Sequence, residues 1–405
     1  MSDYPHREIS QAELIILLAL MTSLGALTID LQLPAMPMIA SDFGLAPGNE
    51  QQWMITAYML GFAVAQLFYG PVSDSVGRKP VLLFGLAVYI IASVACLLAD
   101  SFSLFLAARA VQGVGAAAAR IMVNAITRDH FAGNEMARVT SLVMMIFIMV
   151  PVFAPSLGAL LLHFGPWQFI IYTYLGFGLL LAVWVMVRLP ESLASGQRRP
   201  FRINHIWASF KAVLAEPVSM VFAVISGLVF SGFMAYLNGS EQIFSQMYDA
   251  KDKFPQIFGG IALFFGLAAF INAKIVMRFG VYQVTFWAMS LLLLGNIMGL
   301  ILAGYFAGLP PFFALVIYLG FINVCIGLIY GNLIAIAMLP LGNHAGMGAS
   351  VIGVVSALIA AILGIVISQQ ISTTLYAIVL GFLGSSFCAF LLLYIWRKRV
   401  IEAIN

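Results

Sequence analysis

Twelve long apolar stretches dominate this sequence and limit the folds that it can adopt. A helix that crosses the hydrocarbon core of a bilayer needs about 20 apolar residues. Stretches of about that length run over 14–34, 51–71, 80–98, 103–124, 139–162, 167–187, 217–239, 255–277, 282–305, 311–333, 347–369 and 376–396. The sequence therefore predicts an all-α integral membrane protein with twelve transmembrane helices.

Composition excludes several other classes of protein. Of the 405 residues, 62% are hydrophobic and 9% are charged, and the mean hydropathy is +1.03, whereas soluble domains carry about 25% charged residues. A net charge of +3 leaves no dense basic surface for nucleic acid, so no nucleic-acid partner is expected. Cys96, Cys325 and Cys388 lie in separate apolar stretches and predict neither a metal site nor a disulfide.

Lysine and arginine are distributed unevenly between the two ends of the predicted helices. With the N-terminus in the cytoplasm, fourteen of the 19 Lys and Arg residues lie inside, and only Lys251 and Lys253 lie outside. Positive residues favour the cytoplasmic side, so we expect both termini there. Asp30 and Pro34 lie at the end of the first stretch and Pro37 lies just after it, so we interpret this stretch as a retained helix rather than a cleaved signal peptide.

One long polar connection divides the chain between the sixth and seventh stretches, whereas the other connections are short. We expect two bundles facing each other across a central cavity. The predicted units are a six-helix bundle over 1–188, a cytoplasmic linker over 189–212 and a second six-helix bundle over 213–405.

Two charges are expected at similar depth in the membrane. Asp30 lies about 16 residues into the first stretch, and Arg109 lies about six residues into the fourth, which enters from the outside. An ion pair across the cavity is therefore geometrically reasonable. Burial favours a neutral carboxyl and a nearby guanidinium favours the charged form, so movement of Arg109 would switch proton binding at Asp30. The alternative is a static ion pair that fixes helix packing.

Helical spacing places polar residues on shared faces. Tyr58 and Gln66 share a face of the second stretch, which lines either a pocket or the bundle core. Glu241, near the outer end of the seventh, is either a second titratable group or a hydrated loop acid. The residues that we assign to substrate binding are Tyr58, Gln66, Gln112, Arg120, Asn238 and Glu241.

Arg120 lies 11 residues after Arg109 on the same helical face, about 16 Å deeper toward the cytoplasm. Asp30 cannot form an ion pair with both arginines at that separation. Arg120 either snorkels to the interface, pairs with Asp74 when an inner gate is shut, or faces the cavity and binds the anionic part of a substrate.

The loop after the second stretch combines glycines with charges. Gly70 and Gly77 permit tight turns, and we interpret Asp74 as a gate residue that meets a helix terminus. The preference of positive residues for the cytoplasmic side of the membrane would by itself be enough to account for Arg78. A degenerate copy that ends at Gly280, aligned to Gly77, supports an internal repeat.

Motifs for metal binding, nucleotide binding or nucleophilic catalysis do not occur in the sequence. We therefore expect no catalytic residue, no metal and no cofactor. Transport would then be passive or driven by an ion gradient.

Several motifs resemble those of the major facilitator superfamily. Gly70–Lys79 (G-x-x-x-D-x-x-G-R-K) is similar to its cytoplasmic loop signature, and Arg109–Gly115 (R-x-x-Q-G-x-G) resembles its membrane-embedded arginine motif. Ala154–Ala159 (A-P-x-x-G-A) is similar to the motif of its antiporters, with alanine at two glycine positions. Thr28–Pro37 and Tyr58–Pro71 resemble, more narrowly, the bicyclomycin-resistance (Bcr/CflA) drug efflux branch.

The resemblance implies a major facilitator fold and proton-driven export of small amphipathic compounds, including antibiotics, across a bacterial inner membrane. The implied partners are a small-molecule substrate, protons and the lipid bilayer, and we expect a monomer. The gating residues that we assign are Gly70, Asp74, Gly77, Arg78, Pro155 and Gly158. The alternatives are an exporter of one metabolite, such as a siderophore or amino acid, a membrane-embedded enzyme and a non-transporting sensor. Buried Asp30 and Arg109 favour transport over a sensor.

Overall fold

The computed structural model describes residues 9–46, 49–131, 133–193, 198 and 203–404, and every regular element in these ranges is helical. The helices up to the linker are α1 (Gln11–Asp30), α2 (Met36–Asp42), α3 (Trp53–Val76), α4 (Arg78–Leu97), α5 (Phe102–His130), α6 (Gly133–Phe164) and α7 (Gln168–Arg188). The later helices are α8 (Ile203–Leu214), α9 (Pro217–Glu241), α10 (Phe254–Phe279), α11 (Val281–Tyr305), α12 (Phe312–Met338), α13 (Ala345–Ser368) and α14 (Tyr376–Ile404). Shorter elements are the 3₁₀ helices η1 (Leu33–Ala35), η2 (Glu50–Gln52), η5 (Lys251–Lys253) and η6 (Leu339–His344), and the π-helix η4 (Gln242–Met247).

Each predicted stretch coincides with one long helix. Among the described residues, eleven helical spans are long and apolar enough to cross a membrane. The remaining stretch falls in α6, whose described apolar part is the shorter Met149–Phe164. The all-helical, multi-pass class is therefore confirmed.

The differences from prediction lie at the helix ends. α5 runs on to His130, because Arg128 and His130 suit the negative end of a helix dipole. α8 forms within a segment that was expected to be a polar linker, and it buries Val213. The chain turns after Asp30, where η1 carries Pro34 in its first turn.

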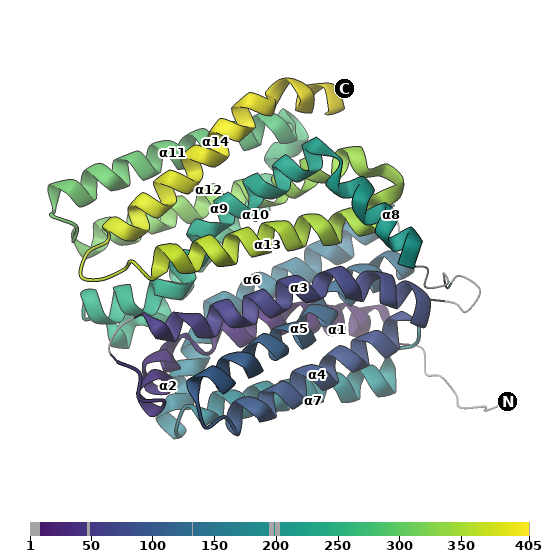
Figure 1. Ribbon diagram of the computed structural model, residues 1–405, viewed down its shortest axis with the longest axis horizontal. Helices are drawn as coiled ribbons and strands as arrows, with labels where there is room; N and C mark the ends of the chain where they lie inside the picture. The colour runs from purple at the N-terminus through teal and green to yellow at the C-terminus, as the bar shows by residue number, and fades with distance from the viewer. Residues whose placement is uncertain (1–8, 47–48, 132, 194–197, 199–202, 405) are drawn as a thin grey trace.

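Helix contacts repeat after six spans. In the first set, α3 packs on α5, α4 packs on α5 and α7, and α1 packs on α5, α6 and α7. In the second set, α10 packs on α12, α11 packs on α12 and α14, and α9 packs on α12, α13 and α14. Helices that hold the same place in the order of each set make the same contacts. The internal repeat is therefore present in the helix packing. Between the sets, α3 contacts α13 and α6 contacts α10 (Figure 1).

Two glycines occupy equivalent junctions in the repeat. Gly77 separates α3 from α4 with a φ of 115°, and Gly280 separates α10 from α11 with a φ of 83°. Residues with a Cβ rarely adopt such angles, so glycine lets one helix end and the next begin at a single residue. This supports the predicted alignment of Gly280 with Gly77.

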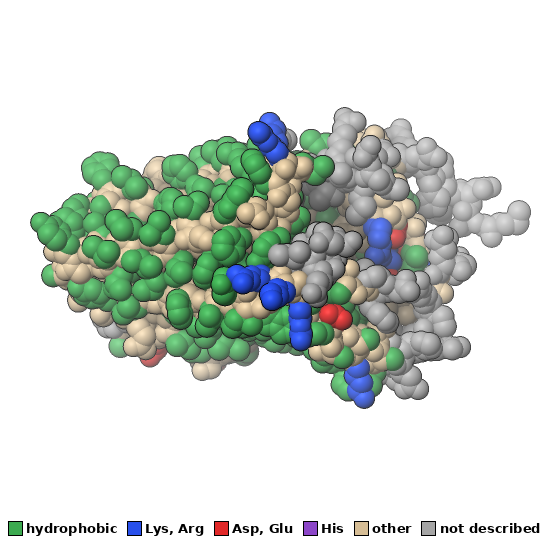
Figure 2. Space-filling model, turned by 90° about the horizontal axis from the view of Figure 1, so that it is seen from above, with side chains coloured by type: hydrophobic (Ala, Val, Ile, Leu, Met, Phe, Trp, Pro, Cys, Tyr) green, Lys and Arg blue, Asp and Glu red, His purple; other side chains and the backbone are tan. Residues whose placement is uncertain are grey.

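One end of the molecule collects the chain ends and much of the positive charge. The first turn of α1, α8 and the end of α14 lie at the right-hand end in Figure 1. The Lys and Arg side chains visible in Figure 2 lie toward this end, and the rest of that face is largely hydrophobic. Phe84, Ile91 and Phe313 are more than 60% exposed. An apolar surface this extensive suits contact with lipid.

Candidate functional site: a central cavity

A cavity of about 1650 Å³ lies between the two sets of helices. Its lining runs from Asp30 and Tyr236 to Asp74, Arg128 and Ser209, which lie at the ends of α3 and α5 and in α8. Most of the lining is apolar, with a few polar groups, as in small-molecule sites, and the volume exceeds the ~300–1,000 Å³ of typical ligand pockets. Large organic molecules therefore fit here.

Asp30 lines the cavity with an unpaired carboxyl. The residue is 4% exposed, and none of the described residues forms an ion pair or hydrogen bond with the carboxyl group. Tyr236 of α9 is close enough to interact electrostatically with it, and the Tyr236 hydroxyl has no hydrogen-bond partner among the described residues. An unpaired carboxylate is costly in such surroundings, so this group is suited to exchanging a proton with the cavity.

Arg109 is fully buried and does not pair with Asp30. Its guanidinium donates to the carbonyl of Thr28 (3.3 Å), to the carbonyl of Met54 (3.4 Å) and to the side-chain oxygen of Gln112. These oxygens take three of its five N–H donors, and the expected ion pair with Asp30 is not formed. Arg109 instead ties α5 to α1 and α3.

Gln112 lies behind the cavity rather than in its lining. It is fully buried, accepts from Arg109 and donates to the Ser93 hydroxyl of α4 at 2.6 Å. Its contacts are those of a residue that orients Arg109.

Three other residues assigned to substrate binding do line the cavity. Tyr58 lies under Arg109, with the guanidinium carbon 4.8 Å from the ring centre. Gln66 lies where α3 meets α13. A Cβ added to Gly353 of α13 would lie 3.2 Å from the side-chain oxygen of Gln66. Arg120 lines the cavity with its guanidinium carbon 5.8 Å from the centre of the Phe147 ring.

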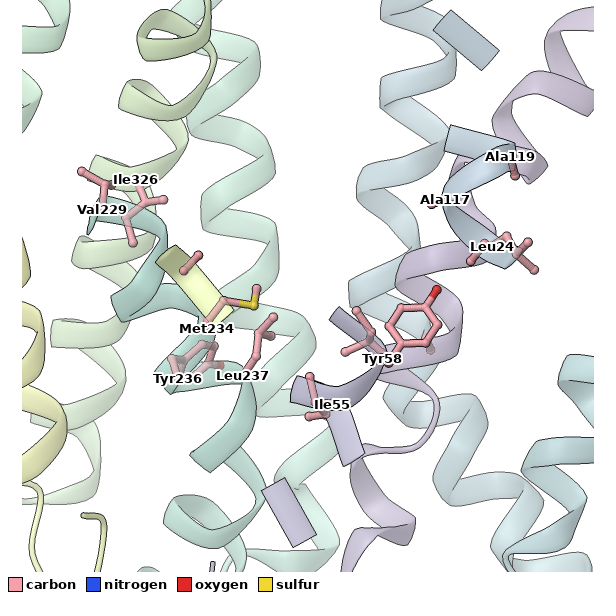
Figure 3. Packing of buried hydrophobic residues seen from close by; sticks show 14 of the residues in the cluster. Leu24, Ile55, Tyr58, Ala117, Ala119, Val229, Met234, Tyr236, Leu237 and Ile326 are labelled. Carbon is pink, nitrogen blue, oxygen red and sulfur yellow. The ribbon is translucent and has the colours of Figure 1, made fainter. Parts of the chain in front are cut away.

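Sequence reasoning missed an aromatic wall on the second set of helices. The wall comprises Phe230, Phe233 and Tyr236 of α9, Phe258 and Phe265 of α10 and Tyr330 of α12, and all six line the cavity. Neighbouring ring centres are 4.7–6.4 Å apart. Tyr58 and Tyr236 lie on opposite sides of the view in Figure 3. The available signal was the spacing of Phe230, Phe233 and Tyr236 on one helical face.

Hydrogen bonds close the end of the molecule opposite α8. The group that we call the amide seam joins Asn49, Gln51, Gln52 and Thr56 of the first set to Asn238, Glu241, Gln242 and Gln369 of the second. Asn49 donates to the carbonyls of Gln369 (2.8 Å) and Ile371 (2.7 Å), and Gln369 donates back to the Asn49 carbonyl at 2.6 Å. Gln52 donates to Gln242 at 3.2 Å.

Asn238 and Glu241 belong to this seam and not to the cavity lining. Asn238 donates to the Thr56 hydroxyl, and Gln51 donates to the Glu241 carboxylate, both at 3.4 Å. Glu241 is 4% exposed, so it is not a hydrated loop acid. A π-helix, η4, begins directly after it, and such turns are frequent at functional sites.

A charged cluster surrounds the junction between α3 and α4. Arg78 donates to Asp74 (2.6 Å) and to Asp129 of α5 (3.1 Å). The carboxylate at the N-terminus of α4 belongs to Glu191, which accepts from the amides of Arg78 (2.8 Å) and Lys79 (3.2 Å). The helix-terminus contact expected for Asp74 is therefore made by Glu191, which the sequence motifs did not single out.

Of the other assigned gating residues, Gly70 lies inside α3 rather than in the expected turn, Gly158 allows close contact between helices, and Pro155 lies buried within α6. Gly70 faces Ser350 of α13, with 3.5 Å from an added Cβ to the hydroxyl oxygen. A Cβ on Gly158 of α6 would lie 2.2 Å from the Leu31 carbonyl oxygen, so α6 presses against the turn after α1. Pro155 removes a hydrogen bond from the same helix.

The fold and cavity define a class: a helical membrane transporter with a central binding chamber. The sequence profile of the Major Facilitator Superfamily matches residues 18–365, and the chain belongs to that family. It is therefore a transporter rather than an enzyme, as the sequence predicts.

Relatives from bacteria match most of the chain. The "Uncharacterized MFS-type transporter YdgK" of Bacillus subtilis is 30% identical over 85% of this chain and 86% of the relative. The "Bicyclomycin resistance protein homolog" of Haemophilus influenzae is 28% identical, with 88% and 89% covered. The "Multidrug resistance protein MdtL" of Vibrio parahaemolyticus is 28% identical, with 88% and 86% covered. The resemblance to drug-resistance transporters is thus confirmed.

A solved structure shares the fold. The human organic anion transporter MFSD10 (TETRAN) superposes with a TM-score of 0.68 and covers 96% of this chain and 100% of its own. The sequence identity is 18%, so this likeness concerns the fold alone.

Proposed function

We propose that the chain exports small amphipathic organic compounds, including antibiotics, in exchange for protons. The observation that carries this proposal is the unpaired, buried carboxyl of Asp30 inside a large aromatic cavity. The relatives named for bicyclomycin and multidrug resistance support drugs as the substrate class.

Transport proceeds by alternating access between two bodies, 1–188 and 213–405, which the cytoplasmic segment 189–212 joins. The repeated contact pattern within each set supports this division. The cavity lining reaches the end where α8 lies, and the amide seam closes the other end. With both termini in the cytoplasm of a bacterium, the seam is the outer closure in the inner membrane. One chain builds the whole cavity, so a monomer suffices.

Asp30 carries the proton in this proposal, and Arg109 acts as its positioning residue. Arg109 holds the carbonyl of Thr28, two residues before Asp30 in α1, at 3.3 Å. A shift of α5 against α1 therefore moves the backbone that presents Asp30 to the cavity. This replaces the direct ion pair as the route by which Arg109 influences proton binding.

Asn49→Ala is expected to raise the fraction of molecules that are open to the outside. The substitution removes two side-chain hydrogen bonds across the amide seam, each worth about 1 kcal/mol. The measurement is labelling of a Leu237→Cys reporter by an impermeant maleimide added outside right-side-out vesicles, in a Cys388→Ser background. Leu237 lines the cavity beside the seam. Labelling should accelerate by up to about thirtyfold, since about 1.4 kcal/mol corresponds to a factor of ten.

Lys253→Ala is the control for this experiment, because Lys253 lies near the same end and is exposed. It should leave the labelling rate unchanged. Equal labelling rates in the Asn49 variant and the parent would contradict an outer closure made by the seam.

The export proposal is tested in efflux-deficient bacterial cells. Accumulation of a panel of antibiotics, fluorescent dyes, siderophores and amino acids is measured with and without expression of the chain, and with and without a protonophore. Expression should lower accumulation of several amphipathic compounds, and the protonophore should cancel that effect. Export of a single siderophore or amino acid would identify a dedicated metabolite exporter instead, and no change for any compound would contradict export.

A further inference from the structure

Arg120 presents a guanidinium to the cavity without an acidic partner. The ion pairs among the described residues join Arg78 to Asp74 and Asp129, and Arg188 to Glu13. Asp74, the one acid that the sequence offered to Arg120, is held by Arg78 at 2.6 Å. A guanidinium stays charged at any physiological pH, so this positive charge is not neutralised by the described part of the protein in this state.

The surroundings of Arg120 combine apolar surface with hydrogen-bonding groups. The guanidinium carbon lies 5.8 Å from the centre of the Phe147 ring on α6. Asn124, one turn further along α5, also lines the cavity. Tyr330 of α12, on the other set of helices, is close enough to interact electrostatically with the guanidinium. Arg120 therefore faces across the cavity rather than along the protein surface, which argues against snorkelling to the interface.

The aromatic wall begins where Tyr330 lies. The ring of Tyr330 packs on Phe230 at 4.7 Å, and Phe230 packs on Phe233 at 4.9 Å. Phe233 in turn stacks on Phe265 at 5.6 Å. One continuous surface thus leads from a free positive charge onto a row of aromatic faces. A molecule with a negative group at one end and an aromatic body matches this sequence of surfaces.

We propose that Arg120 binds the acidic group of an exported amphipathic organic acid, whose aromatic body lies along Phe230, Phe233 and Phe265. The inference rests on the proposed export function and adds the substrate class. A planar guanidinium binds a carboxylate through two parallel hydrogen bonds, whereas an ammonium group acts as a point charge. Tyr330 and Asn124, which also line the cavity, carry further hydrogen-bond donors.

The test uses a matched pair of ligands and the full-length chain in lipid nanodiscs. The ligands are 2-naphthoxyacetic acid and its primary amide, which share the aromatic body and differ in charge. Dissociation constants are measured by isothermal titration calorimetry at pH 7. The wild-type chain should bind the acid about tenfold more tightly than the amide, because hydrogen bonds to charged groups are the stronger kind.

Arg120→Gln should abolish the preference for the acid while changing amide binding by less than about twofold. Arg120→Lys keeps the charge but loses the two-pronged geometry, so it should retain only part of the preference. Lys211→Gln is the matched control. It removes the same charge from α8, outside the cavity lining, and should keep the wild-type preference.

Equal binding of acid and amide by the wild-type chain would overturn the inference, whether or not the variants fold. Equal loss of both ligands in a folded Arg120→Gln variant would also overturn it and indicate a gating or structural role. The accumulation experiment described above tests the proposed export function independently of this binding result. Protonophore-sensitive export of neutral compounds would leave export standing even when the acid preference is absent.

Discussion

Asp30→Asn is expected to abolish proton-driven export while leaving the amount of folded protein in the membrane unchanged. Asparagine has the shape of a protonated aspartic acid but cannot release a proton. The carboxyl makes no ion pair or hydrogen bond among the described residues, so the substitution breaks no such interaction. The measurement is uptake of an exported compound into everted membrane vesicles energised with an imposed pH gradient, where the signal should fall to that of vesicles without the transporter.

Asp100→Asn is the control for this substitution, because Asp100 is an exposed carboxyl in the connection between α4 and α5. It should transport at the wild-type rate. Counterflow of labelled against unlabelled substrate, which needs no proton movement, should survive in Asp30→Asn and shows that the cavity still binds. Undiminished uptake by Asp30→Asn across several pH values would exclude Asp30 as the coupling group.

Gly113→Ala is expected to lower the stability of the protein strongly, although it adds a single methyl group. The new Cβ would lie 2.0 Å from the Tyr58 carbonyl oxygen and 2.9 Å from the Phe62 nitrogen, both backbone atoms of α3. Backbone atoms cannot rotate away as side chains do, so α3 and α5 must separate. The expected cost is about 3 kcal/mol, at the upper end for overpacking. Movement of α5 would also disturb the contacts of Arg109.

Gly176→Ala is the matched control, because a Cβ at Gly176 of α7 meets no atom within 4 Å. Alanine is a better helix former than glycine by about 1 kcal/mol, so this variant should be as stable as the parent or slightly more so. The readout is the fraction of detergent-solubilised protein that stays monodisperse after heating. Equal heat resistance of the two variants would contradict a packing role for Gly113.

Helices whose positions follow from the length of an apolar stretch were predictable from the sequence. The twelve apolar stretches coincide with long helices, because each stretch must satisfy its own backbone hydrogen bonds in lipid. The shared role of Gly77 and Gly280 was also predictable, since only glycine tolerates their backbone angles. In both cases the physical requirement acts on adjacent residues along the chain.

Features that depend on distant partners were not predictable. Arg109 bonds to the carbonyls of Thr28 and Met54, and every residue carries a carbonyl, so no residue type marks these partners. The aromatic wall uses phenylalanines that do not differ in kind from those facing lipid, such as Phe313. Likewise, Glu241 was placed at the correct end of α9, but its contact with Gln51 requires knowledge of how the two sets meet.

The two ends of the molecule are held by different kinds of chemistry. Apart from Glu241, the amide seam consists of neutral groups, whereas Arg78, Asp74, Asp129 and Glu191 form a charged cluster at the other end. Dissolved ions weaken contacts between exposed charges and leave neutral hydrogen bonds nearly untouched. With the orientation proposed above, the closure that faces the surroundings is the one least affected by salinity. Such a transporter would keep its outer side shut in fresh water and in brine alike, and at its cytoplasmic end the response to ionic strength would be confined to the exposed carboxylate of Asp74, because Arg78 is buried.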